Sequence, residues 1–160
     1  MLTATPQPAE PPPALPEQKP EQISRMPEGL VSYWAEIARG RPFASWSDFD
    51  PALIAENWPN SMLLTCGPPE RSGDVPIAKV TRIVGKDGAT ATAKRVEYTP
   101  MLTDWILSMG RKTAKAGKPT QDTERFPTTN GGIVRYQIVL LPLSDKKTVV
   151  EHVLCHVSRA

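Results

Sequence analysis

The chain has 160 residues, a formal net charge of +2 and a mean hydropathy of −0.34. A chain of this length buries one hydrophobic core, so we expect a single domain of ordinary size. The near-neutral charge excludes a global field that would steer the protein to nucleic acid or to an anionic membrane. No apolar run approaches the roughly 18 residues of a membrane span, and the N-terminus lacks a signal-peptide pattern. We therefore expect a cytoplasmic protein.

Two cysteines, Cys66 and Cys155, are far apart in the sequence and cannot form a disulfide framework. Free cysteine usually packs as a small apolar side chain. We expect both thiols to be reduced and buried rather than redox-active.

Residues 1–22 are rich in proline and contain no aromatic residue. Such a segment buries too little apolar surface to offset the entropy lost on ordering, so we predict a disordered, partly polyproline-like tail. The alternative is that PPPALP docks in an aromatic groove of a partner. Residues 23–160 then form the single folded domain.

The first predicted element is a helix from Pro27 to Arg39. Proline suits the first helical position because its missing N–H would have no partner there, and Gly40 is a suitable stop. Apolar residues recur at three- and four-residue spacing, which predicts one buried stripe. Its central members are Leu30, Trp34 and Ile37.

A second, shorter helix is predicted in SWSDFDPALIAENWPN. It begins at Asp50-Pro51 and ends at Trp58-Pro59, because aspartate caps helices and proline stops them. Its apolar set of Leu53, Ile54 and Trp58 predicts that it packs as a flank or lid.

Two strands are predicted next, at Ser61–Cys66 and Pro76–Gly85. In the second, the face with Ala78, Val80, Arg82 and Val84 is the more apolar, which predicts a half-buried strand. It is closed by a turn at residues 85–88.

A well-marked helix follows, with Thr99 as cap and Pro100 as first residue. Its basic run, from Arg111 to Lys118, lacks the aromatic residues of a single-strand nucleic-acid binder. We interpret it as a solvated helix end, and nonspecific nucleic-acid contact is the alternative. The basic residues are Arg111, Lys112, Lys115 and Lys118; the apolar face holds Met101, Leu102, Trp105, Ile106 and Met109.

The last third predicts a hairpin of two strands, Gly132–Ser144 and Thr148–Ser158, joined by Asp145–Lys147. In RYQIVLLPLSD both faces of the strand carry apolar residues, which predicts a central strand covered on each side. We expect Pro142 to end the regular ladder, because it has no N–H to donate.

The residue patterns thus predict two helices, two strands, a third helix and two strands. Short links favour antiparallel pairing in an α+β domain. The stretches LVSYWAEIARGRPFASWSDFDP and RYQIVLLPLSD resemble the two ends of a bacterial family of stand-alone PAS-like proteins, over most of residues 28–157. The matching residues are Tyr33, Trp34, Arg41, Pro42, Asp48, Asp50 and Pro51 at the front, and Arg135, Tyr136, Leu141, Pro142, Leu143 and Ser144 at the rear.

This resemblance implies a PAS-like five-stranded antiparallel sheet with helices on one face, preceded by an N-terminal amphipathic helix. It also implies a homodimer through that helix. In the middle of the chain only Arg82 and Gly85 match, and the family's Phe-Gly motif is missing. The departure weakens the expectation of the family's ligand pocket but not that of its fold.

His152 and His156 are the only candidates for metal chemistry, since alternation puts both on one face of a strand. A third ligand is missing nearby, and Glu151 points to the other face, so we predict no metal site. There is no G-x-S-x-G elbow, and Gly85–Gly88 lacks the spacing of a phosphate-binding loop. We therefore predict no catalytic residue and no cofactor.

The function that these patterns favour is a non-catalytic sensory or protein-interaction module in bacterial signalling, whose partner is a protein or a small ligand between sheet and helices. The alternative is a small-molecule- or metal-binding domain, or an enzyme, that uses His152 and His156. Neither reading requires a membrane or a specific nucleic acid. The predicted pocket residues are Trp58, Met62, Leu64, Trp105, Met109, Tyr136, Ile138 and Leu140.

Overall fold

A computed structural model of the chain describes residues 26–84 and 96–160. The predicted tail and the turn at residues 85–88 lie outside the described residues. The five strands form one antiparallel sheet in the order β2-β1-β5-β4-β3, which confirms the predicted α+β fold class. The elements are α1 (Pro27–Ala38), the 3₁₀ turn η2 (Trp46–Asp48), α2 (Pro51–Asn57), β1 (Ser61–Cys66), β2 (Ile77–Arg82), α3 (Pro100–Ala116), β3 (Thr120–Pro127), β4 (Ile133–Leu143) and β5 (His152–Arg159).

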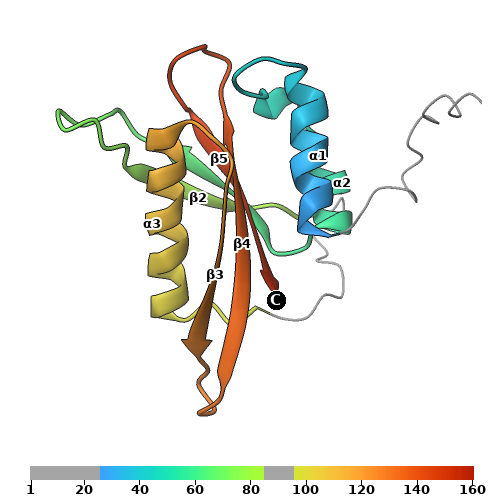
Figure 1. The fold of residues 1–160 in the computed structure, drawn as a ribbon, viewed down its shortest axis with the longest axis vertical. Helices are drawn as coiled ribbons and strands as arrows, with labels where there is room; N and C mark the ends of the chain where they lie inside the picture. Colours follow the sequence, from blue (N-terminus) through green and yellow to red (C-terminus); the bar gives the residue numbers. More distant parts are fainter. Residues whose placement is uncertain (1–25, 85–95) are drawn as a thin grey trace, which may run out of the picture.

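The helices lie in two layers. The resemblance implies helices on one face of the sheet, and this detail is wrong: α3 covers one face, whereas α1 and α2 lie against the other, as Figure 1 shows. We call the two resulting cores the α3 core and the α1 core. The α1 core forms because α1 packs on the sheet of its own chain through the fully buried Leu30.

The expectation of a central strand holds only in part: β4 is an inner strand beside the edge strand β3, and β5 is the middle strand. Strand β4 does divide its side chains between the two cores, as its sequence predicts. Tyr136, Ile138 and Leu140 enter the α3 core, and Val139 and Leu141 enter the α1 core. All five are buried, so RYQIVLLPLSD is the shared middle of the domain.

The predicted helix starts are confirmed. Proline occupies the first turn of all three helices, and the side chains of Asp50 and Thr99 accept hydrogen bonds from Ala52 N at 3.1 Å and Leu102 N at 3.2 Å. Helix α1 ends at Ala38 because Arg39 and Gly40 adopt positive φ angles of 48° and 80°.

The residue patterns predict four strands, and the fifth strand of the structure, β3, is not among them. It pairs with β4 from Thr120↔Leu140 to Pro127↔Ile133, but only Phe126 among its residues is buried. A strand at the edge of the sheet needs no apolar alternation, so its sequence carries no local signal. The other edge strand, β2, is more exposed than predicted, with Val80 47% exposed.

The β4–β5 hairpin is confirmed, but its connection is longer than the predicted three residues. Ser144 leaves the ladder because its N–H donates to Ala44 O at 3.0 Å and its hydroxyl donates to Glu151 Oε1 at 3.1 Å. The expectation that Pro142 ends the ladder is wrong, because it still pairs with Val153. Pairing with β3 ends at Leu140, so on that side no neighbouring strand needs an N–H from Pro142.

The front and rear motifs of the sequence meet in the fold. Trp34 Nε1 on α1 donates to the carbonyl of Pro142 on β4 at 2.8 Å. The Tyr33 hydroxyl accepts from Asp50 N at 3.1 Å, which ties α1 to the start of α2. Arg41 donates to the carbonyls of Ile37 and Ala38 and so caps the end of α1. These residues therefore have structural roles. Over the described residues, no helix is long and apolar enough to cross a bilayer.

Candidate functional site

The predicted pocket residues do not form one pocket. Seven of them lie in or against the α3 core, but Trp58 lies in the α1 core, where its Nε1 donates to Met26 O at 3.1 Å. Leu64, Ile138 and Leu140 are completely buried. Only one of the predicted residues, Met62, also lines the cavity described next.

A small cavity lies between the β2 edge of the sheet and α3, and we call it the edge cavity. Its volume is about 180 Å³. Apolar side chains from β1, β2 and α3 make most of its wall. The lining residues are Met62, Val80, Arg82, Tyr98, Thr103, Ile106 and Leu107.

Local structure explains why these side chains converge. Met62 pairs with Arg82 across the β1–β2 ladder, and side chains alternate, so Val80 and Arg82 face the same side as Met62. On α3, Thr103 lies three and four residues before Ile106 and Leu107, which brings the three to neighbouring surface positions. Tyr98 comes directly before the Thr99 cap.

The polar groups of the edge cavity are concentrated at Arg82 and Tyr98. The Arg82 guanidinium carbon lies 4.6 Å from the centre of the Tyr98 ring, a cation–π geometry. Burial raises the pKa of Tyr98 to about 12, against the lowering effect of Arg82, so the phenol is neutral at physiological pH. Neither salt bridge found among the described residues involves Arg82.

Sequence reasoning missed most of this cavity. The lining residues come from positions as far apart in the sequence as Met62 and Leu107. Nothing in the local pattern predicts that β2 lies beside the start of α3. One signal is present in the sequence: Arg82 interrupts the more apolar face of its strand. An arginine in that place is typical of a strand face that reaches solvent, and Arg82 is exposed.

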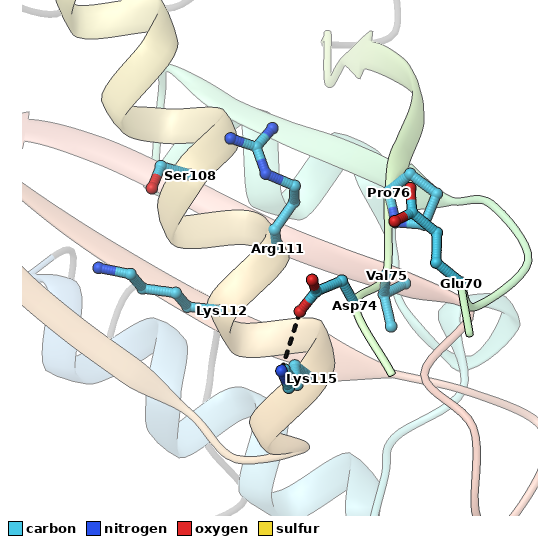
Figure 2. Close-up of a pocket in the computed structure, with 8 residues that line it drawn as sticks. All are labelled: Glu70, Asp74, Val75, Pro76, Ser108, Arg111, Lys112 and Lys115. Carbon is cyan, nitrogen blue, oxygen red and sulfur yellow. Dashed lines mark hydrogen bonds and ion pairs between the residues drawn. The ribbon is translucent and has the colours of Figure 1, made fainter. Parts of the chain in front are cut away.

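A second hollow, of about 430 Å³, lies beside the basic half of α3, and Figure 2 shows its lining. Lys115 Nζ contacts Asp74 Oδ1 at 2.9 Å, and this contact and Ser72 lower the pKa of the exposed Asp74 carboxyl. Acidic side chains thus face the basic run, so the hollow is not a uniformly positive surface of the kind that binds nucleic-acid phosphates. The lining residues are Glu70, Asp74, Val75, Pro76, Ser108, Arg111, Lys112 and Lys115.

The two histidines lie on the α1 side of β5, as alternation predicts, with Leu154 between them. Four residues of strand separate their Cα atoms by about 13 Å, too far for both rings to bind one ion. His156 is 4% exposed; its Nδ1 lies 3.3 Å from Ser61 Oγ, and its ring hydrogen-bonds the Pro59 carbonyl. Among the described residues, no group of three or more His, Cys, Asp or Glu side chains is placed to hold a metal.

The two thiols are free, as predicted; Cys155 is buried and Cys66 is half-buried. Burial raises the pKa of Cys66 to about 11 and raises the pKa of Cys155 as well. Both are protonated at physiological pH, and a protonated thiol is a poor nucleophile.

Comparisons with known proteins give structural neighbours only. No protein-family model matches the chain, and no curated protein matches it in sequence. The light-state blue-light photoreceptor Aureochrome1 LOV is 18% identical with a TM-score of 0.35, covering 63% of this chain and 86% of its own. The PAS domain of a protein from Colwellia psychrerythraea is 11% identical with a TM-score of 0.33. The match covers 62% of this chain and 86% of that domain's chain.

A fungal LOV domain photoreceptor is 14% identical with a TM-score of 0.35, covering 83% of this chain and 90% of its own. Identity and TM-score are low for all three structures. None of them identifies a ligand or a family for this chain.

Proposed function

We propose that the chain is a non-catalytic, PAS-like sensory or interaction module of bacterial cytoplasmic signalling, and that it binds a small ligand between its sheet and α3. The observation that carries the proposal is the edge cavity. It is a concave, mostly apolar site with few polar groups, which is the usual character of a small-molecule site. The sheet of five antiparallel strands agrees with the PAS-like resemblance of the two end motifs.

The edge cavity also limits the size of the ligand. Its volume of about 180 Å³ is below the roughly 300–1,000 Å³ of most ligand sites. The neighbouring Met62 and Ile106 are 5% and 3% exposed, so the wall behind them is closed by packed core. The ligand therefore has one ring or a short chain.

Toluene titrated into the isotope-labelled chain of 160 residues tests this site. We expect amide and methyl NMR shifts that are concentrated at the lining residues. Leu107→Trp should abolish them, because the indole fills the space that the ligand needs. Met101→Trp is the matched control, since Met101 is 58% exposed on the same helix and does not line the cavity. Shifts that are absent in the wild type, or equal in the two variants, would show that the cavity is not a ligand site.

For partners we propose self-association through α1. The inner side of α1 is already packed on its own sheet, so a second copy would contact the exposed outer side, which carries Glu28, Ser32 and Glu36. Both copies bring the same acidic side chains to this contact, so their charges repel each other and added salt should strengthen the dimer by screening them. Light scattering over a range of salt concentrations should show a dimer fraction that grows with salt, and a monomer under all conditions would contradict the proposal.

A further inference from the structure

We propose that the edge cavity binds a small organic carboxylate, with a single aromatic ring or a short aliphatic chain in the apolar part and the carboxylate on Arg82. This inference rests on the proposed ligand-binding function and adds the chemical class of the ligand.

The volume of the edge cavity and the residues that line it determine the apolar part of the ligand. An apolar cavity of about 150 Å³ in another protein accepts benzene, so about 180 Å³ is room for one ring or a short chain. Met62, Val80, Ile106 and Leu107 offer such a group only hydrocarbon and thioether contacts. A dicyclic ligand or a cofactor of nucleotide size would not fit.

The charge of the ligand follows from Arg82. One face of the Arg82 guanidinium is covered by the Tyr98 ring, whose centre lies 4.6 Å from the guanidinium carbon. Stacking leaves the N–H groups at the edge of the guanidinium available. The hydrogen bonds found in the described part of the chain include none from the Arg82 side chain, and no lining residue is acidic. A ligand carboxylate therefore has no competitor within the cavity wall.

Two further lining groups are neutral hydroxyls. The Tyr98 phenol keeps its proton at physiological pH, since its pKa is raised to about 12, and Thr103 has an ordinary hydroxyl. Both can donate to a carboxylate oxygen, and neither repels an anion. A single arginine beside neutral donors matches one negative charge better than the two charges of a phosphate monoester.

The experiment compares an acid with its neutral isostere. Phenylacetate and phenylacetamide are titrated into the chain of 160 residues, with toluene as the apolar reference, and affinities are measured by NMR or calorimetry. We expect phenylacetate to bind about ten-fold more tightly than the amide, because a charge-assisted contact is gained. In Arg82→Met, which keeps an unbranched side chain without the charge, the two ligands should bind equally. Lys79→Met is the matched control, since it removes a charge from the opposite face of the same strand.

The outcomes separate the two proposals. If toluene and both phenylacetyl ligands bind with no preference for the acid, the ligand class is wrong and the ligand-binding function stands. If the preference survives in Arg82→Met, or is lost equally in Lys79→Met, Arg82 is not the carboxylate site. If none of the three compounds shifts the lining residues, the ligand-binding function is wrong as well.

Discussion

His156 is a titratable side chain held in an apolar layer. Burial lowers its pKa from 6.5 to about 4, although the bond to the Pro59 carbonyl works in the opposite direction. Between these two pH values the unfolded chain binds a proton that the folded protein does not. The free energy of unfolding therefore decreases as the pH falls from about 6.5 to about 4, and above pH 6.5 this histidine has no effect.

We expect His156→Gln to remove most of that pH dependence. The shift from 6.5 to about 4 corresponds to about 3 kcal/mol, at roughly 1.4 kcal/mol per pKa unit. The measurement is urea unfolding of wild type and variant at several pH values in this range. His152→Gln, on the same strand and face, is the control for the loss of an imidazole. Equal slopes in wild type and His156→Gln would contradict the prediction.

At the scale of elements, α1 is attached to the sheet by apolar burial and by one directed bond from Trp34 to Pro142. Trp34→Phe keeps most of the ring and removes the N–H, so the carbonyl of Pro142 loses its partner. We expect the free energy of unfolding to fall by about 1 kcal/mol. Trp46→Phe is the control, because the half-buried Trp46 stacks on Phe49 and its indole donates no hydrogen bond within residues 26–84 and 96–160. A change no larger than that of the control would mean that the bond contributes nothing measurable.

Helix α3 approaches β1 closely at Gly110. A Cβ atom added there would lie 2.5 Å from Leu64 Cδ1, and Leu64 is completely buried. We expect Gly110→Ala to lower the free energy of unfolding by about 1 kcal/mol, because overpacking exceeds the gain of about 1 kcal/mol in helix propensity.

The same Gly110→Ala substitution made in a Leu64→Ala variant identifies the cause of the expected loss of stability. In Leu64→Ala the contacting methyl is gone, so adding Gly110→Ala should cost nothing or stabilise the protein. An equal loss in both backgrounds, measured by chemical denaturation, would show that the close approach to Leu64 is not the reason.

The whole molecule has two cores that share one sheet. Leu140 and Leu141 are adjacent on β4 and completely buried in opposite cores. Because both cores depend on the same strands, we expect Leu140→Ala and Leu141→Ala each to lower the free energy of unfolding by about 2–5 kcal/mol. Unfolding should stay a single transition in tryptophan fluorescence and in far-ultraviolet circular dichroism. Two separated transitions in either variant would show that the layers unfold independently.

Much of this architecture is visible in the sequence because its signals are local. Proline and a capping side chain mark the start of α2 and α3, and Gly40 marks the end of α1 to within one residue. Strand alternation alone predicts that β4 is covered on both faces. Such features depend on neighbouring residues and on the periodicity of helix and strand.

Other features are decided only by the tertiary structure, because they join distant residues. Strand β3 exists through its ladder with β4, and its own residues are mostly polar and exposed. The residue pattern groups Trp58 with side chains of the α3 core, although it lies in the α1 core, because a local pattern does not say which face of the sheet an element will cover. The edge cavity forms where Arg82 and Tyr98 meet, and only pairing of β2 with β1 and packing of α3 bring those two side chains together.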